Sequence, residues 1–104
     1  MFVRVWEYDV PDDSVAAFRV AYADDGDWAL LFRRAPGFLG TELYRDPNRG
    51  DRFLTIDRWR SEQDWRAFQA AFSSVYQALD ARLEGLADTE RSLFEGSSAI
   101  VSEP

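Results

Sequence analysis

The chain of 104 residues contains no cysteine, no histidine and no lysine, and it has a single methionine. The lack of cysteine and histidine excludes Ser-His-Asp and Cys-His catalysis, histidine-ligated haem, thiol redox chemistry and the common zinc ligand sets. The lack of lysine excludes Schiff-base catalysis. Carboxylates, arginines, tyrosines and tryptophans remain to carry any chemistry, and we expect no metal and no other cofactor.

Long apolar runs are also missing. No segment approaches the roughly 18 apolar residues that a membrane span requires, and the first residues lack the pattern of a signal peptide. The 12 arginines are interspersed among 19 acidic residues, for a net charge of -7, which argues against nucleic acid or an anionic membrane as the main partner. We therefore expect a cytoplasmic protein that binds a small neutral or weakly acidic molecule.

The hydrophobic content of 46% suits one domain that spans residues 1–104, with a frayed end at 102–104. Alternation of apolar and polar residues indicates strands, and spacings of three and four indicate helices. These patterns predict strands at 2–10, 38–45, 52–59 and 92–101, a helix at 13–23 that resumes at 28–34, and a long helix at 61–84. This order predicts an α+β, ferredoxin-like βαββαβ fold with a four-stranded antiparallel sheet.

The two breaks in the helical pattern have local explanations. Gly26 is expected to take the left-handed conformation that closes the first helix, with Asp27 capping the next piece. Ser61 and Asp64 resemble a capping box at the start of the long helix. Gly85 is expected to end it. The apolar residues of that helix are predicted to share one face: Trp65, Phe68, Phe72, Val75, Leu79 and Leu83.

Both faces of the predicted sheet are apolar. Strict alternation along each strand divides the side chains into two sets. Because two helices cover one face only, a monomer would expose a large apolar surface. We expect a homodimer in which two sheets pack face to face. The alternative is that the C-terminal segment alone covers the second face. The two sets of strand side chains are as follows. The first contains Val3, Val5, Leu39, Leu43, Leu54 and Ile56. The second contains Trp6, Tyr8, Phe38, Glu42, Tyr44, Phe53, Asp57 and Trp59.

The sequence resembles the antibiotic biosynthesis monooxygenase family of dimeric α/β barrels over about residues 2–95. The resemblance rests on the opening strand with its capped helix, the turn at 36–40, and the strand-end Trp59 with Ser61 and Glu62 after it. It implies a homodimer whose enzymatic members oxidise a phenol, quinol or polyketide-like substrate with dioxygen and no cofactor. Many members carry a histidine where this chain has Phe68, which disfavours haem degradation. By resemblance, Trp59 would stack on a planar ligand.

Such chemistry requires dry aromatic walls and a base. Asp57 and Glu42 are the candidate bases, because burial among rings would raise the pKa of either carboxyl. The purely structural alternatives are that Asp57 forms an ion pair with Arg45, Arg52 or Arg58, and that the helical aromatic residues Trp65, Phe68 and Phe72 are ordinary core. An inert ligand-binding or assembly module, or an isomerase- or cyclase-type barrel, are the alternatives to an oxygenase. The predicted pocket residues are Trp6, Tyr44, Phe53, Trp59, Phe68 and Phe72.

Overall fold

The structure, a computed structural model, describes residues 1–99. The predicted ferredoxin-like order is confirmed, although the last strand begins at Thr89 rather than Ser92. The last strand also ends at Ser97, earlier than predicted, while positions 100–101 of the predicted strand and the predicted fraying of 102–104 lie outside the described residues. The elements are β1 (Phe2–Asp9), a 3-10 turn (Asp12–Ser14), α1 (Val15–Tyr22), α2 (Asp27–Phe32), β2 (Phe38–Arg45), β3 (Arg52–Trp59), α3 (Glu62–Ala71), α4 (Ser73–Leu83) and β4 (Thr89–Ser97).

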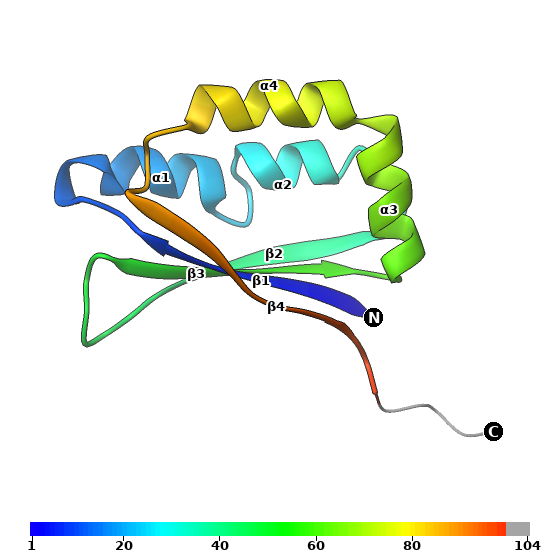
Figure 1. Ribbon diagram of the computed structural model, residues 1–104, viewed down its shortest axis with the longest axis horizontal. Coiled ribbons are helices and arrows are strands. Elements are labelled where there is room, and N and C mark those ends of the chain that lie inside the picture. The colour runs from blue at the N-terminus through cyan, green and yellow to red at the C-terminus, as the bar shows by residue number, and fades with distance from the viewer. Residues whose placement is uncertain (100–104) are drawn as a thin grey trace.

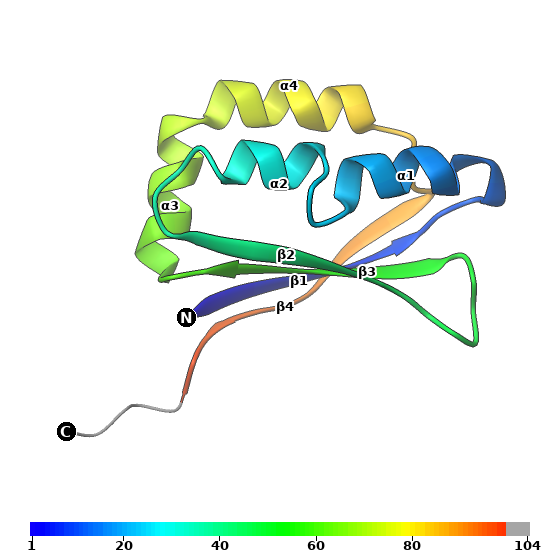
Figure 2. The ribbon, with the colours of Figure 1, turned by 180° about the vertical axis from the view of Figure 1, so that it is seen from behind.

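The four strands form one antiparallel sheet in the order β2-β3-β1-β4. The first strand of the chain therefore lies inside the sheet, between β3 and the last strand. Figures 1 and 2 show that the helices all lie on one side of this sheet and that the other side is bare. We call the two sides the helix face and the open face.

The long C-terminal helix is broken, contrary to the prediction of one continuous helix. Phe72 has φ -119° and ψ 21°, outside the helical region, and it separates α3 from α4. The two helices run in different directions in Figure 1. The break rotates the apolar stripe, so that Val75 is 40% exposed while Tyr76 packs against the core. Spacings of three and four continue through the break, which is why the sequence pattern does not reveal it.

Gly26 does not take the predicted left-handed conformation. Its φ is -82°, and it occupies the N-cap position of α2 that was predicted for Asp27. Glycine is required for space, because a Cβ atom there would lie 2.5 Å from the carbonyl oxygen of Val20. Gly85, in contrast, has φ +90° and follows the end of α4 as predicted.

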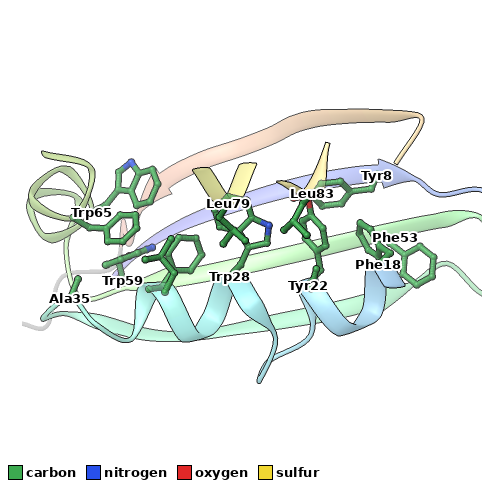
Figure 3. Close-up of a cluster of buried hydrophobic side chains, with 14 of the residues drawn as sticks. Tyr8, Phe18, Tyr22, Trp28, Ala35, Phe53, Trp59, Trp65, Leu79 and Leu83 are labelled. Carbon is green, nitrogen blue, oxygen red and sulfur yellow. The ribbon is translucent and has the colours of Figure 1, made fainter. Parts of the chain in front are cut away.

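The core is an aromatic cluster between the helix face and the helices, and Trp59 lies at its densest part. Trp59 is fully buried, and its ring centroid lies 5.2–5.6 Å from those of Phe32, Phe38, Trp65 and Phe68. Figure 3 shows Trp59 and Trp65 together at one end of the cluster and Trp28 near its middle. Trp59 thus joins β3 to the hairpin partner, to α2 and to α3.

A bulge in β2 reverses the predicted facing of its residues. Phe38 pairs with Trp59, but Gly40 already pairs with Arg58, so one extra residue is inserted in β2. Gly40 has φ +151°, which favours glycine at this point. Strict alternation is therefore wrong beyond the bulge. Leu43 lies on the helix face, whereas Glu42 and Tyr44 lie on the open face, opposite to Asp57.

The predicted capping of α3 is confirmed and gives a first test. The Ser61 hydroxyl accepts a hydrogen bond from the backbone N–H of Asp64 at 3.1 Å. Ser61→Ala should lower the free energy of unfolding by about 1 kcal/mol, because that N–H loses its partner. Urea unfolding followed by circular dichroism measures the change. Ser74→Ala, at an exposed position of α4, is the matched control and should not destabilise; equal losses in both variants would contradict the capping role.

Candidate functional site

A cavity of about 50 Å³ lies between the helix face and the helices. The sheet contributes a cation, two carboxylates, two threonines and two aromatic residues, and the helices contribute mainly aromatic rings. The wall thus combines several polar groups with a largely aromatic surround, which is the usual composition of a small-molecule site. The lining residues are Arg4, Trp6, Tyr8, Tyr22, Trp28, Phe32, Thr41, Thr55, Asp57, Tyr76, Asp80 and Glu90.

Asp57 is a buried carboxylate on this wall, with 8% of its surface exposed. The Thr41 hydroxyl donates a hydrogen bond to Asp57 Oδ1 at 2.7 Å. Burial raises the pKa of Asp57 to about 6, against the opposing effects of the Thr41 hydrogen bond and of the Arg4 charge. A carboxyl with such a pKa exchanges a proton readily near neutral pH, as a general base requires.

The arginines that the sequence offered as partners of Asp57 bind elsewhere. Arg58 forms an ion pair with Glu42 at 2.7 Å, and Arg52 forms one with Glu7 at 2.5 Å. Arg45 donates to the backbone oxygen of Gly50. Asp57 is therefore not neutralised by the residues expected to neutralise it.

Arg4 is the cation of the cavity, and the sequence analysis did not single it out. It is 9% exposed and lies opposite Asp57 in the pairing of β1 with β3. Its guanidinium lies 4.0 Å from the ring centroid of Trp65, and its Nε donates to Glu95 Oε1 at 3.1 Å. The sequence did contain a signal that Arg4 is buried: it lies at every-second-residue spacing between Phe2 and Trp6, on the apolar face of the first strand.

Three tyrosines surround the cavity, and all of them stay protonated near neutral pH. Burial raises the pKa of Tyr8, and it raises the pKa of Tyr22 to about 12. Burial also raises the pKa of Tyr76, although the Arg4 charge opposes that rise. The Trp28 indole N–H is buried and has no hydrogen-bond partner among the described residues. The tyrosines and Trp28 therefore supply neutral donors, while the charged groups of the lining are Arg4, Asp57 and Glu90 on the sheet and Asp80 on α4.

The predicted pocket residues are only partly brought together. Trp6 and Asp57 line the cavity. Of the remaining predicted residues, some lie in the core and some on the open face. Glu42 lies on the open face, where it accepts from Tyr44 at 2.6 Å and pairs with Arg58, so its predicted placement beside Asp57 is wrong. The others pack within the aromatic core and do not line the cavity: Phe53, Trp59, Phe68 and Phe72.

A larger hollow adjoins the cavity where α4 ends and β4 begins. It measures about 390 Å³ and shares Tyr22, Asp80 and Glu90 with the cavity wall. Burial and the neighbouring Asp80 raise the pKa of Glu90. The side that leads from the surface to the cavity is therefore flanked by carboxylates, which disfavours anionic ligands at the point of entry.

A sequence profile of the antibiotic biosynthesis monooxygenase family matches residues 1–82, the part of the chain that builds most of this cavity. The chain belongs to this family. No curated protein matches the chain. Membership agrees with the observed fold. Within residues 1–99, no helix is long and apolar enough to cross a membrane.

Solved structures similar to this family member share its fold at low identity. SnoaB from Streptomyces nogalater, a cofactor-independent oxygenase, is 22% identical, with a TM-score of 0.70 over 96% of this chain and 94% of that one. A protein from Bordetella bronchiseptica is 17% identical, with a TM-score of 0.74 over 95% and 97%. MhuD from Mycobacterium tuberculosis, a haem degrader, is 20% identical, with a TM-score of 0.69 over 99% and 100%.

The raised pKa of Asp57 predicts how stability depends on pH. The folded pKa is above the unfolded value, so the stabilising contribution of the neutral carboxyl is complete below about pH 4 and is lost as pH rises through about 6. The stability of the natural protein relative to Asp57→Asn should therefore fall over this window, by on the order of 2–3 kcal/mol. Chemical unfolding at several pH values measures it.

Thr41→Val sharpens this test. The variant removes the hydrogen bond that favours ionised Asp57, so the loss of stability should extend to higher pH than in the natural protein. A constant difference between the natural protein and Asp57→Asn across the pH range would contradict the assignment of a raised pKa to Asp57.

Proposed function

We propose that the chain binds a small planar phenol or quinol in the cavity and oxidises it with dioxygen, without metal or flavin, using Asp57 as the general base. One observation carries this proposal: a buried carboxylate with a pKa of about 6 faces an aromatic cavity that also holds a buried cation. SnoaB, the cofactor-independent oxygenase among the similar structures, supports the reaction class.

The first step is a proton transfer. A neutral phenol enters and donates its O–H to ionised Asp57, which yields a phenolate and a neutral carboxyl without changing the charge of the cavity. The surrounding rings of Trp6, Trp28 and Phe32 exclude water from the electron-rich anion. The Thr41 hydroxyl holds the carboxyl in place through its hydrogen bond.

The second step takes its electrons from the substrate. The ionised ring attacks dioxygen at carbon, so that a C–O bond forms and the substrate is oxidised. Cleavage of the O–O bond then leaves one oxygen atom on the ring carbon as a carbonyl and releases the other as water, with both hydrogens of that water derived from the substrate. Asp57 carries a proton between these events.

The cavity size limits the ligand. A cavity of about 50 Å³ is well below the roughly 150 Å³ that holds benzene, so the wall opens on binding even a single ring. The residues present do not fit haem: Phe68 offers no iron ligand and is packed against Trp59 and Trp65, and a porphyrin needs a pocket of several hundred cubic ångströms. Haem therefore has no part in the proposed reaction.

Dimerisation through the open face belongs to the same proposal. Val3, Val5, Leu54 and Ile56 are only half-buried there, and Phe94 is 57% exposed. β4 pairs at the sheet edge beside β1 and does not cover this face, which disfavours the alternative of a C-terminal cover within the described residues. A second copy supplies an apolar surface of the same shape.

Oxygen uptake tests the reaction. With hydroquinone or anthrone as substrate, Asp57→Asn should reduce uptake at an oxygen electrode by about 10²–10⁴-fold, because the base is lost. Glu42→Gln is the matched comparison, since it removes a carboxylate from the open face. Loss of uptake in Glu42→Gln together with full uptake in Asp57→Asn would overturn the assignment of the base. Ligand binding without uptake would favour the inert module, and turnover without uptake an isomerase or cyclase.

Light scattering after size exclusion tests the dimer. Ile56→Asp should halve the measured mass at micromolar concentration, because a carboxylate would be buried in the apolar interface. Val20→Asp is the matched control: Val20 is 69% exposed on α1, on the helix side of the sheet, and its replacement should leave the mass unchanged. A folded natural protein that elutes as a monomer would contradict the proposal.

A further inference from the structure

Arg4 occupies an unusual position for a guanidinium. It is nine-tenths buried on the helix face, where its neighbours along β1 are Phe2 and Trp6. Its plane is supported by the Trp65 ring at 4.0 Å, and Trp6 lies 5.5 Å away. A buried charge is costly unless it is paired, and the planar guanidinium is the cation that best donates to oxygen acceptors in such a place.

The pairing of Arg4 is incomplete. Its ion pair with Glu95 uses Nε, and Glu95 itself is on the edge strand with 46% of its side chain exposed. No ion pair joins Arg4 to Asp57 within residues 1–99, although the two residues are directly opposed on β1 and β3. Asp57 takes its hydrogen bond from Thr41 instead. The cation and the carboxylate thus flank the cavity without neutralising each other.

We propose that Arg4 binds the oxygen of the substrate hydroxyl and holds it as an oxyanion once Asp57 has taken its proton. The inference rests on the proposed function and adds a specificity: ligands must carry an acidic hydroxyl on a planar ring. A phenol oxygen between the two groups donates to Asp57 and accepts from Arg4, and after proton transfer the phenolate remains on the guanidinium. An aryl methyl ether has no proton to donate, cannot become an oxyanion, and therefore gains no charge-assisted hydrogen bond from Arg4.

The other charged groups of the wall do not replace this role. Asp80 and Glu90 are carboxylates at the side toward the surface hollow, and Tyr8, Tyr22 and Tyr76 remain neutral. Within the described lining, Arg4 is the cation available to an oxyanion. The stack on Trp65 and the tie to Glu95 hold it in one orientation, so binding does not have to order a long side chain.

The experiment titrates a bound chromogenic phenol and needs no turnover. 4-Nitrophenol changes its visible absorbance when it ionises, so its pKa in the cavity is read directly under anaerobic conditions. Asp57→Asn serves as the reference protein, because it removes the competing base. In this protein the pKa of bound 4-nitrophenol should lie below the free value, and adding Arg4→Met should raise it by at least one unit, a tenfold loss of phenolate at fixed pH.

Matched controls separate the charge from the packing. Arg4→Lys in the same background should keep most of the lowered pKa, because a cation stays at this position. 4-Nitroanisole, the methyl ether, should bind equally with and without Arg4→Met. If circular dichroism shows that Arg4→Met is unfolded, Arg4→Gln replaces it.

Two results overturn the inference: an unchanged pKa of bound 4-nitrophenol in Arg4→Met or Arg4→Gln, or equal loss of 4-nitroanisole and 4-nitrophenol binding. Failure of 4-nitrophenol to bind any form overturns both this inference and the proposed function. A lowered pKa that depends on Arg4, in a protein that consumes no oxygen with any phenol, upholds the oxyanion site and removes the oxygenase.

Discussion

Packing around Trp59 is the interaction on which the rest of the structure depends. Its ring contacts α2, α3 and the neighbouring strand at once, so it determines where the helices lie over the sheet. The same contacts place Trp65 against Arg4 and direct the helices over Asp57. A dense aromatic cluster at one end leaves a small space next to it, and the polar residues of β1 and β3 line that space. The position of the candidate site is therefore determined by the packing of the aromatic cluster around Trp59.

The charge arrangement of the cavity explains why a base and a cation coexist there. Had Arg4 and Asp57 formed a tight pair, the carboxyl would have stayed ionised with a low pKa and the guanidinium would have had no free side. Arg4 on β1 is held by Glu95 on β4, and Asp57 on β3 is held by Thr41 on β2. Each residue is thus held by a side chain from a neighbouring strand. The result is a polarised cavity in which a proton moves a short way without a change in net charge.

The sequence predicted the fold well and the site poorly, for physical reasons. Period-two and period-3.6 patterns identify strands and helices, which is why the element order and the Ser61 cap were recovered. A bulge leaves those patterns almost intact while it inverts every later side chain, so Glu42 and Tyr44 were assigned to the wrong face. Asp57 and Trp6 were found because no bulge lies between their positions in the β1–β3 pairing. Arg4 was missed because a charged residue in a strand suggests solvent until its partners are known.

The central place of β1 has a consequence for how the protein is made. β1 precedes both of its neighbours, β3 and β4, along the chain, and the link from Arg4 to Glu95 spans 91 positions. Contacts of such separation form late and slow folding. Until β3 and β4 have been synthesised, β1 is an aromatic-rich strand without its sheet partners, and unpaired strands of this kind are prone to aggregation.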